Sequence, residues 1–164
     1  MMARYQSLAQ RLRTELEDLE QTQTAVQRHW QGFKSSAVDQ DAYLNSVAFN
    51  LHSLYCSLER MFELIAVELD GGTLGGERWH SELLSQMALD LPEVRPPVLS
   101  KAAATGLDEY RKFRHLVRNI YASNLDPGRM ETLVASLPSV WNQVRQDISA
   151  FVRFLERLAR ADQG

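Results

Sequence analysis

The chain has little of the chemistry that staples small proteins together or carries proteins into membranes. Its single cysteine, Cys56, excludes a disulfide within the chain and a cysteine-based zinc site. No apolar run approaches the roughly 20 residues needed to cross a bilayer. The first residues also lack the apolar stretch of a secretory signal. We therefore expect a cytoplasmic protein that does not enter a membrane.

An excess of positive charge is also absent. The 18 lysines and arginines are outnumbered by 21 aspartates and glutamates, which gives a net charge of -3. This balance excludes a protein that coats nucleic acid through its global charge. Any contact with nucleic acid must therefore come from a local basic patch.

Glycine and proline are sparse, and they gather into a few breaks. Only 8 glycines and 5 prolines occur in 164 residues. Between the breaks no segment alternates apolar and polar residues as a half-buried strand does. The sequence therefore predicts an all-α fold, an antiparallel bundle of about five helices, with residues 1–164 forming a single domain. The expected helices cover about residues 3–31, 40–70, 80–89, 100–123 and 127–161.

The first two predicted helices differ in the pattern of their apolar residues. The first carries one narrow seam with a seven-residue repeat, formed by Tyr5, Leu12, Leu19, Val26 and Phe33. The second carries two adjoining apolar stripes and is expected at the centre of the bundle. Asp39 or Asp41 is a candidate N-cap of the second helix, and Gly71 or Gly72 is a candidate left-handed stop.

The last predicted helix has a clear start and an interior proline. Asp126 followed by Pro127 is typical of an N-cap with proline at the first helical position. Because proline lacks an N–H and clashes with the preceding turn, we expect an interruption or kink near Pro138.

Motifs of nucleotide-binding loops, zinc proteases and serine hydrolases are absent. The glycine run at 71–76 follows a predicted helix and lacks a lysine, so we interpret it as a connector.

Four histidines fall on four different predicted helices, and none has a second histidine at ligand spacing; they are His29, His52, His80 and His115. We interpret His80 as local structure and Cys56 as a small apolar residue. No metal site and no cofactor are expected.

A basic cluster marks the fourth predicted helix. At about 100° per residue, Arg111, Arg114, His115 and Arg118 fall within one wedge of roughly 100°, and no acidic residue occurs from 111 to 125. One interpretation is a solvated basic face whose arginines pair with acids on neighbouring helices, which contributes about 0–1 kcal/mol per pair. The other is a phosphate-binding surface, since arginine grips phosphate oxygens in two places and an adjacent imidazole or amide positions or moves a proton.

The run Glu109–Tyr121 resembles the motif helix of HEPN-domain proteins, specifically the HepT-like ribonuclease toxins. In that signature an arginine and a polar residue precede a histidine and a tyrosine, which places Arg114, His115, Asn119 and Tyr121 on the motif. Two further stretches, Ser53–Ala66 and Trp79–Met87, are also similar to the family. The resemblance implies an all-α homodimer whose motif helices face one cleft, and metal-independent RNA cleavage. It also implies pairing with a nucleotidyltransferase-type antitoxin that transfers AMP to the motif tyrosine, here Tyr121.

The chain departs from the family at one motif position, where Asn119 stands in place of the catalytic histidine. An amide does not exchange a proton near neutral pH as imidazole does. Three hypotheses follow. The first is an RNA-cleaving toxin in which Arg114, His115 and Asn119 act with the phosphate-binding Arg111 and Arg118. The second is a member that binds RNA, a nucleotide or its nucleotidyltransferase partner without cutting. The third is a structural helical protein whose basic strip is an interaction face.

Overall fold

The computed structural model describes residues 2–73, 75–119 and 125–164, with side chains of the fourth helix described up to Val117. Within these residues the chain forms five helices and one isolated antiparallel bridge, between Leu91 and Arg95. The helices are α1 (Met2–Ser35), α2 (Gln40–Leu69), α3 (Trp79–Met87), α4 (Lys101–Asn119) and α5 (Pro127–Ala161). The prediction of an all-α bundle is confirmed.

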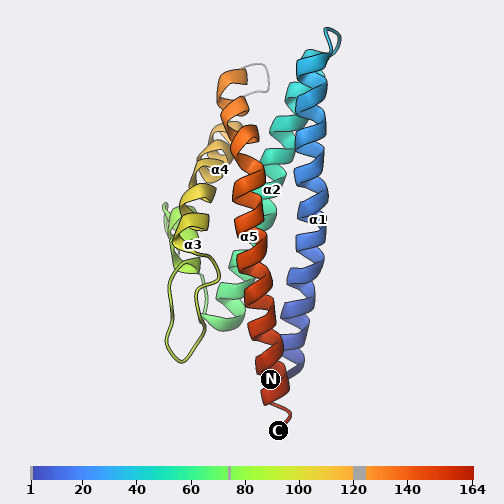
Figure 1. The fold of residues 1–164 in the computed structure, drawn as a ribbon. Coiled ribbons are helices and arrows are strands. Elements are labelled where there is room, and N and C mark those ends of the chain that lie inside the picture. The colour runs from blue at the N-terminus through green and yellow to red at the C-terminus, as the bar shows by residue number, and fades with distance from the viewer. Residues whose placement is uncertain (1, 74, 120–124) are drawn as a thin grey trace.

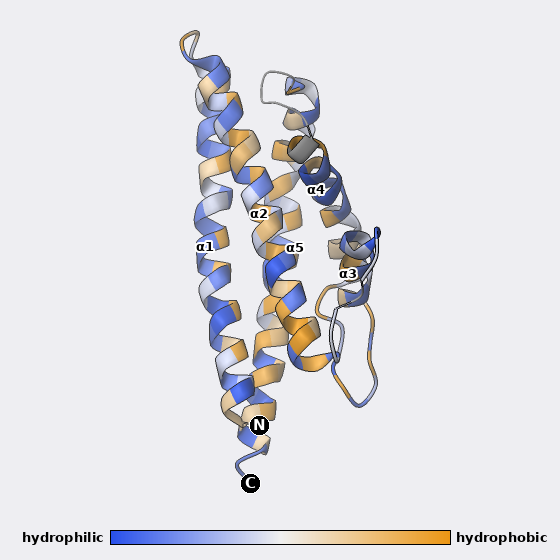
Figure 2. Cartoon of the chain, turned by 180° about the vertical axis from the view of Figure 1, so that it is seen from behind, coloured by the Kyte–Doolittle hydropathy of each residue, from blue (hydrophilic) through white to orange (hydrophobic). Residues whose placement is uncertain are grey.

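Three long helices form the body of the bundle. Figure 1 shows α1, α2 and α5 running lengthwise beside one another, with α3 and α4 on the side away from α1. The α2 helix contacts α1, α3 and α4, and α5 contacts α1 and α4. In Figure 2 the apolar residues are dense along α2 and α5, whereas α1 and α4 carry more hydrophilic residues. Across the described residues, none of the helices combines the length and the apolar character that crossing a membrane requires.

The α2 helix occupies the centre, as its two apolar stripes predict. Its buried residues run from Val47 to Ala66. The helix ends in a left-handed turn, since Gly71 has φ 89° and the Gly72 N–H donates to the Ala66 carbonyl at 3.0 Å. At the other end Asp39 holds the N-cap position in a left-handed conformation, with φ 60°, and its side chain makes no capping hydrogen bond.

The α5 helix runs without interruption through Pro138, so the predicted interruption is wrong, while a kink there stays a prediction. Proline at 138 cannot donate to the Val134 carbonyl, one turn earlier. The side-chain amide of Gln27, on α1, donates to that carbonyl instead, at 3.2 Å. A contact from a neighbouring helix therefore satisfies the group that proline leaves unbonded. The predicted start is confirmed, since the Asp126 carboxylate accepts from the N–H of Gly128 and Pro127 opens the helix.

Polar contacts to α5 hold α4 in place along its length. Asp147 of α5 accepts hydrogen bonds from the backbone N–H and the hydroxyl of Ser100, at 2.9 and 2.8 Å. The same hydroxyl accepts from the N–H of Ala103, which caps the first turn of α4. Two turns further along, the hydroxyl of Tyr110 donates to the Leu133 carbonyl at 2.7 Å. The helix that carries the basic cluster is therefore fixed against the bundle.

The segment between α3 and α4 is secured by a buried ion pair. Arg95 contacts Asp70 through two nitrogens, Nε at 2.6 Å and Nη2 at 2.7 Å. The Arg95 side chain is fully buried, and that of Asp70 is 2% exposed. Arg95 also donates to the carbonyls of Gln86 and Leu89 at the end of α3. The pair thereby joins the end of α2 to the end of α3 and sets where α3 lies.

Candidate functional site

Arg114, the motif arginine, points into the seam between α4 and α2. Its Nε donates to the sulfur of Cys56 at 3.1 Å, and its Nη2 lies 3.7 Å from Oε1 of Glu59. Cys56 and Glu59 are three residues apart, so both lie on the face of α2 that meets α4. The Arg114 side chain is only 14% exposed. The sulfur of Cys56 and the carboxylate of Glu59, both on α2, therefore hold its guanidinium in place.

Glu59 is the centre of this arrangement. Its side chain is 5% exposed, and its second oxygen, Oε2, lies 2.6 Å from Nδ1 of His80, the second residue of α3. The rings of Trp79 and His80 lie in contact, with their centroids 3.6 Å apart. One buried carboxylate on α2 thus contacts an imidazole on α3 and a guanidinium on α4.

Sequence reasoning missed Cys56, Glu59 and His80 as members of this site. Cys56 was interpreted as a small apolar residue and His80 as local structure, yet both contact the charged cluster. The available signal was Glu59 itself, a carboxylate next to Leu58 on the most apolar helix of the chain. Acidic residues are almost never fully buried without a partner, so a buried glutamate implies a cation nearby.

The electrostatics of the cluster keep Arg114 charged and Tyr55 neutral. Burial acts to lower the pKa of Arg114, but the hydrogen bond to Cys56 and the charge of Glu59 outweigh burial and raise that pKa above its ordinary value. Burial also raises the pKa of the Tyr55 hydroxyl far above its ordinary value, and the charge of Glu59 adds to the shift. Among the described residues this buried hydroxyl has no hydrogen-bond partner.

Arg111 lies one turn before Arg114 and is paired within its own helix. Its Nε contacts Oδ1 of Asp108 at 2.7 Å, and Lys112 lies 3.4 Å from the other oxygen of that carboxylate. Burial acts to raise the pKa of Asp108, but the hydrogen bond and charge of Arg111, with those of Lys112, hold it below its ordinary value. Arg111 therefore belongs to a local ion pair on α4.

The remaining predicted site residues are placed only in part. His115 is exposed on α4. Arg118 and Asn119 belong to the last turn of α4, but their side chains lie outside the described residues, and Tyr121 lies wholly outside them. The structure thus brings Arg111 and Arg114 to one stretch of α4, and the roles of Arg118, Asn119 and Tyr121 stay predictions.

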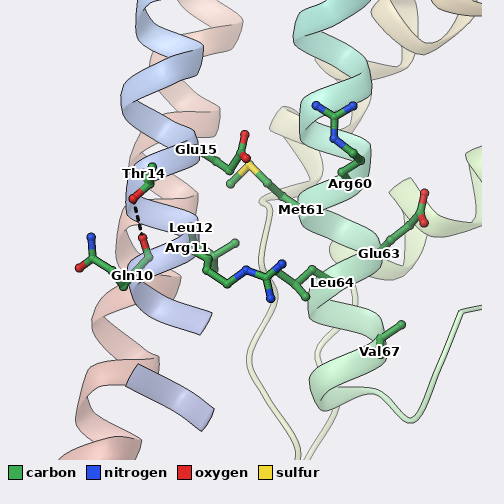
Figure 3. Close-up of a pocket in the computed structure, with 10 residues that line it drawn as sticks. All are labelled: Gln10, Arg11, Leu12, Thr14, Glu15, Arg60, Met61, Glu63, Leu64 and Val67. Carbon is green, nitrogen blue, oxygen red and sulfur yellow. Dashed lines mark hydrogen bonds between the residues drawn. The ribbon is translucent and has the colours of Figure 1, made fainter. Parts of the chain in front are cut away.

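Two of the surface pockets formed by the described residues lie against α2 or α4. One, of about 510 Å³, lies between α3 and α4; its polar lining includes Ser85, Thr105, Asp108 and Arg111. The other, of about 540 Å³, lies between α1 and α2, and Figure 3 shows Arg11 reaching across its apolar floor. Its lining residues include none of the predicted site residues. The α3–α4 pocket is therefore the one that adjoins the basic helix.

Within the described residues no group of three or more His, Cys, Asp and Glu side chains could hold a metal ion. Residues 46–155, well over half of the 164-residue chain, match the family described as HepT-like protein. The chain belongs to this HepT-like family. The match confirms the resemblance drawn from the motif helix, and it includes Cys56, Glu59, His80 and Arg114. No curated protein and no solved structure matches the chain.

Proposed function

We propose that this HepT-like protein is the toxin of a toxin–antitoxin pair and that it cleaves RNA without a metal ion. The observation that carries the proposal is the fixed guanidinium of Arg114 on α4, which Cys56 and Glu59 of α2 hold in place. From residue 111 to residue 125 the sequence around Arg114 contains no acidic residue. Membership of the HepT-like family supports the same conclusion.

The chemistry requires little beyond a held cation and a proton carrier. In metal-independent cleavage the 2′-hydroxyl of a ribose attacks the adjacent phosphorus, and negative charge grows on the phosphate oxygens. Arginine carries five N–H donors, and two of its three nitrogens face Cys56 and Glu59. The donors that remain grip the phosphate, and because the guanidinium is already oriented, little conformational entropy is lost when it does so.

The active form that we propose is a homodimer in which two α4 helices face one cleft. Membership of the HepT-like family supports this arrangement. In the same proposal a nucleotidyltransferase antitoxin silences the toxin by transferring AMP to Tyr121, which intact-mass measurement after co-expression detects.

A second candidate function is RNA or partner binding without cleavage. Asn119 favours it, because an amide in the motif position of the catalytic histidine leaves that position without a proton carrier. In this case Arg114 still binds phosphate, and the RNA stays intact.

Incubation of purified protein with RNA in EDTA separates the two functions. The proposed function predicts cleavage by the parent and a loss of at least about 10²-fold in rate in Arg114→Ala, in line with the removal of one charge-stabilising donor. Arg153→Ala, on an exposed position of α5, is the matched control and should cleave as the parent does. Salt-sensitive binding of RNA that stays intact with the parent, together with cleavage by Asn119→His, would instead support the binding function.

A further inference from the structure

His80 is oriented in a way that a purely structural histidine does not require. Its Nδ1 lies 2.6 Å from Oε2 of Glu59, and the imidazole side chain is 23% exposed. Within the part of the chain that the structure describes, its Nε2 makes no hydrogen bond. A carboxylate at Nδ1 favours the tautomer that carries its proton there, which leaves the lone pair of Nε2 available to accept a proton.

We infer that His80 supplies the proton-transferring imidazole that this chain lacks at position 119. The inference rests on the proposed RNA cleavage and assigns the residue that performs one step of it. Glu59 contacts His80 through Oε2 and Arg114 through Oε1, at 2.6 and 3.7 Å. Arg114 and His80 are therefore joined through one buried carboxylate, although the two residues are on different helices.

The arrangement has the same logic as a carboxylate–imidazole pair in a hydrolase. The carboxylate fixes the ring and stabilises the imidazolium once it has formed, while the opposite nitrogen does the chemistry. Two further features favour this use of His80. Trp79 packs against its ring, and the Arg95–Asp70 pair fixes the far end of α3. His80 thus sits on a rigid element, as catalytic groups must.

In the proposed cleavage His80 moves one proton. The 2′-oxygen–phosphorus bond forms and the phosphorus–5′-oxygen bond breaks, giving a 2′,3′-cyclic phosphate and a 5′-hydroxyl. Nε2 of His80 takes the proton of the 2′-hydroxyl, and a solvent water protonates the departing 5′-oxygen. The imidazolium then returns its proton to the hydroxide that remains. Arg114 stabilises the charge on the phosphate and takes no part in proton transfer.

The test compares steady-state cleavage by the parent, His80→Gln and Glu59→Gln in EDTA between about pH 5 and 8, the range in which histidine titrates. We expect His80→Gln to lower kcat by about 10²–10⁴ with little change in KM. The pH profile of His80→Gln should also differ in shape from that of the parent. Glu59→Gln should lower kcat less. Glu59 of α2 contacts the imidazole directly, and Glu59 also contacts Arg114 of α4.

Chemical rescue separates a catalytic imidazole from a structural one. His80→Ala in buffer that contains free imidazole should regain cleavage in proportion to the imidazole concentration, whereas Arg114→Ala should not. His29→Gln, whose imidazole bonds the Ser46 hydroxyl away from the cluster, is the matched control and should keep the parent's kcat and pH profile.

The results distinguish a failure of the proposed RNA cleavage from a failure of the role inferred for His80. If the parent cleaves and His80→Gln cleaves with the same kcat and pH profile, the inference is wrong and the proposed function stands. Loss of activity in His80→Ala without rescue by imidazole, together with a lowered melting temperature, would make His80 structural and would also overturn the inference. If the parent leaves RNA intact, the proposed function fails and the inference fails with it.

Discussion

Removing Arg95 should cost this fold more than removing any exposed arginine. Its side chain is fully buried and contacts both oxygens of Asp70, at 2.6 and 2.7 Å. Truncation of one partner of such a pair leaves a buried charge without compensation, which costs about 3–5 kcal/mol. Because the pair has almost no solvent exposure, no discount for screening applies. For a domain of this size the loss corresponds to a fall of about 6–20 °C in melting temperature.

Urea denaturation followed by circular dichroism measures this cost. Arg4→Ala is the matched control, because Arg4 also pairs with a carboxylate, Glu68, but both side chains are partly exposed. An exposed pair contributes about 0–1 kcal/mol, so the control should unfold almost as the parent does.

A compensating double variant sharpens the test. In Arg95→Met with Asp70→Leu both charges are replaced by apolar side chains of similar volume, which is often neutral or stabilising at a buried pair. The double variant should therefore recover most of the stability that Arg95→Ala loses. A loss below about 1 kcal/mol in Arg95→Ala would refute the reasoning, because it would mean that the pair is not held in a buried environment.

Two further predictions concern stability. Gln27→Ala should destabilise the protein by about 1 kcal/mol, since the Val134 carbonyl loses its donor. Adding Pro138→Ala should relieve much of that loss, because it restores a backbone N–H. Equal losses of stability in urea for the single and the double variant would contradict this. Because the pKa of Asp108 is held below its ordinary value, chiefly by Arg111, its contribution is present at neutral pH and is lost as the pH falls through the folded-state pKa. Asp108→Asn should therefore flatten the acid limb of a stability–pH curve, and an unchanged limb would argue against the pairing.

Most of the fold could be predicted from the periodic spacing of apolar residues along each helix. The seam of the first helix predicted its buried residues Leu12, Leu19 and Val26, because a local period of apolar residues is visible in the sequence itself. The prediction of an interruption at Pro138 was wrong because the contact that decides it is not local in the sequence. Whether a helix tolerates proline depends on a donor from another helix, here Gln27, which lies 107 residues before Val134 in the chain.

The site could be predicted only along α4. Arg111 and Arg114 were found because their spacing and the absence of nearby acids are local features. The groups that orient Arg114 were not found, since Cys56 and Glu59 are brought to it by the packing of α2 against α4. His80 reaches the same carboxylate only because α3 folds back onto α2. Glu59, a carboxylate on the most apolar helix of the chain, was the local sign of these contacts.

The account depends most directly on cleavage of RNA by the purified protein in EDTA, with the product ends analysed. It predicts fragments that end in a 2′,3′-cyclic phosphate and a 5′-hydroxyl, formed by the parent and by Arg153→Ala but not by Arg114→Ala. RNA that stays intact with the parent, or fragments that form equally with Arg114→Ala, would contradict the claim that the guanidinium held by Cys56 and Glu59 acts on phosphate.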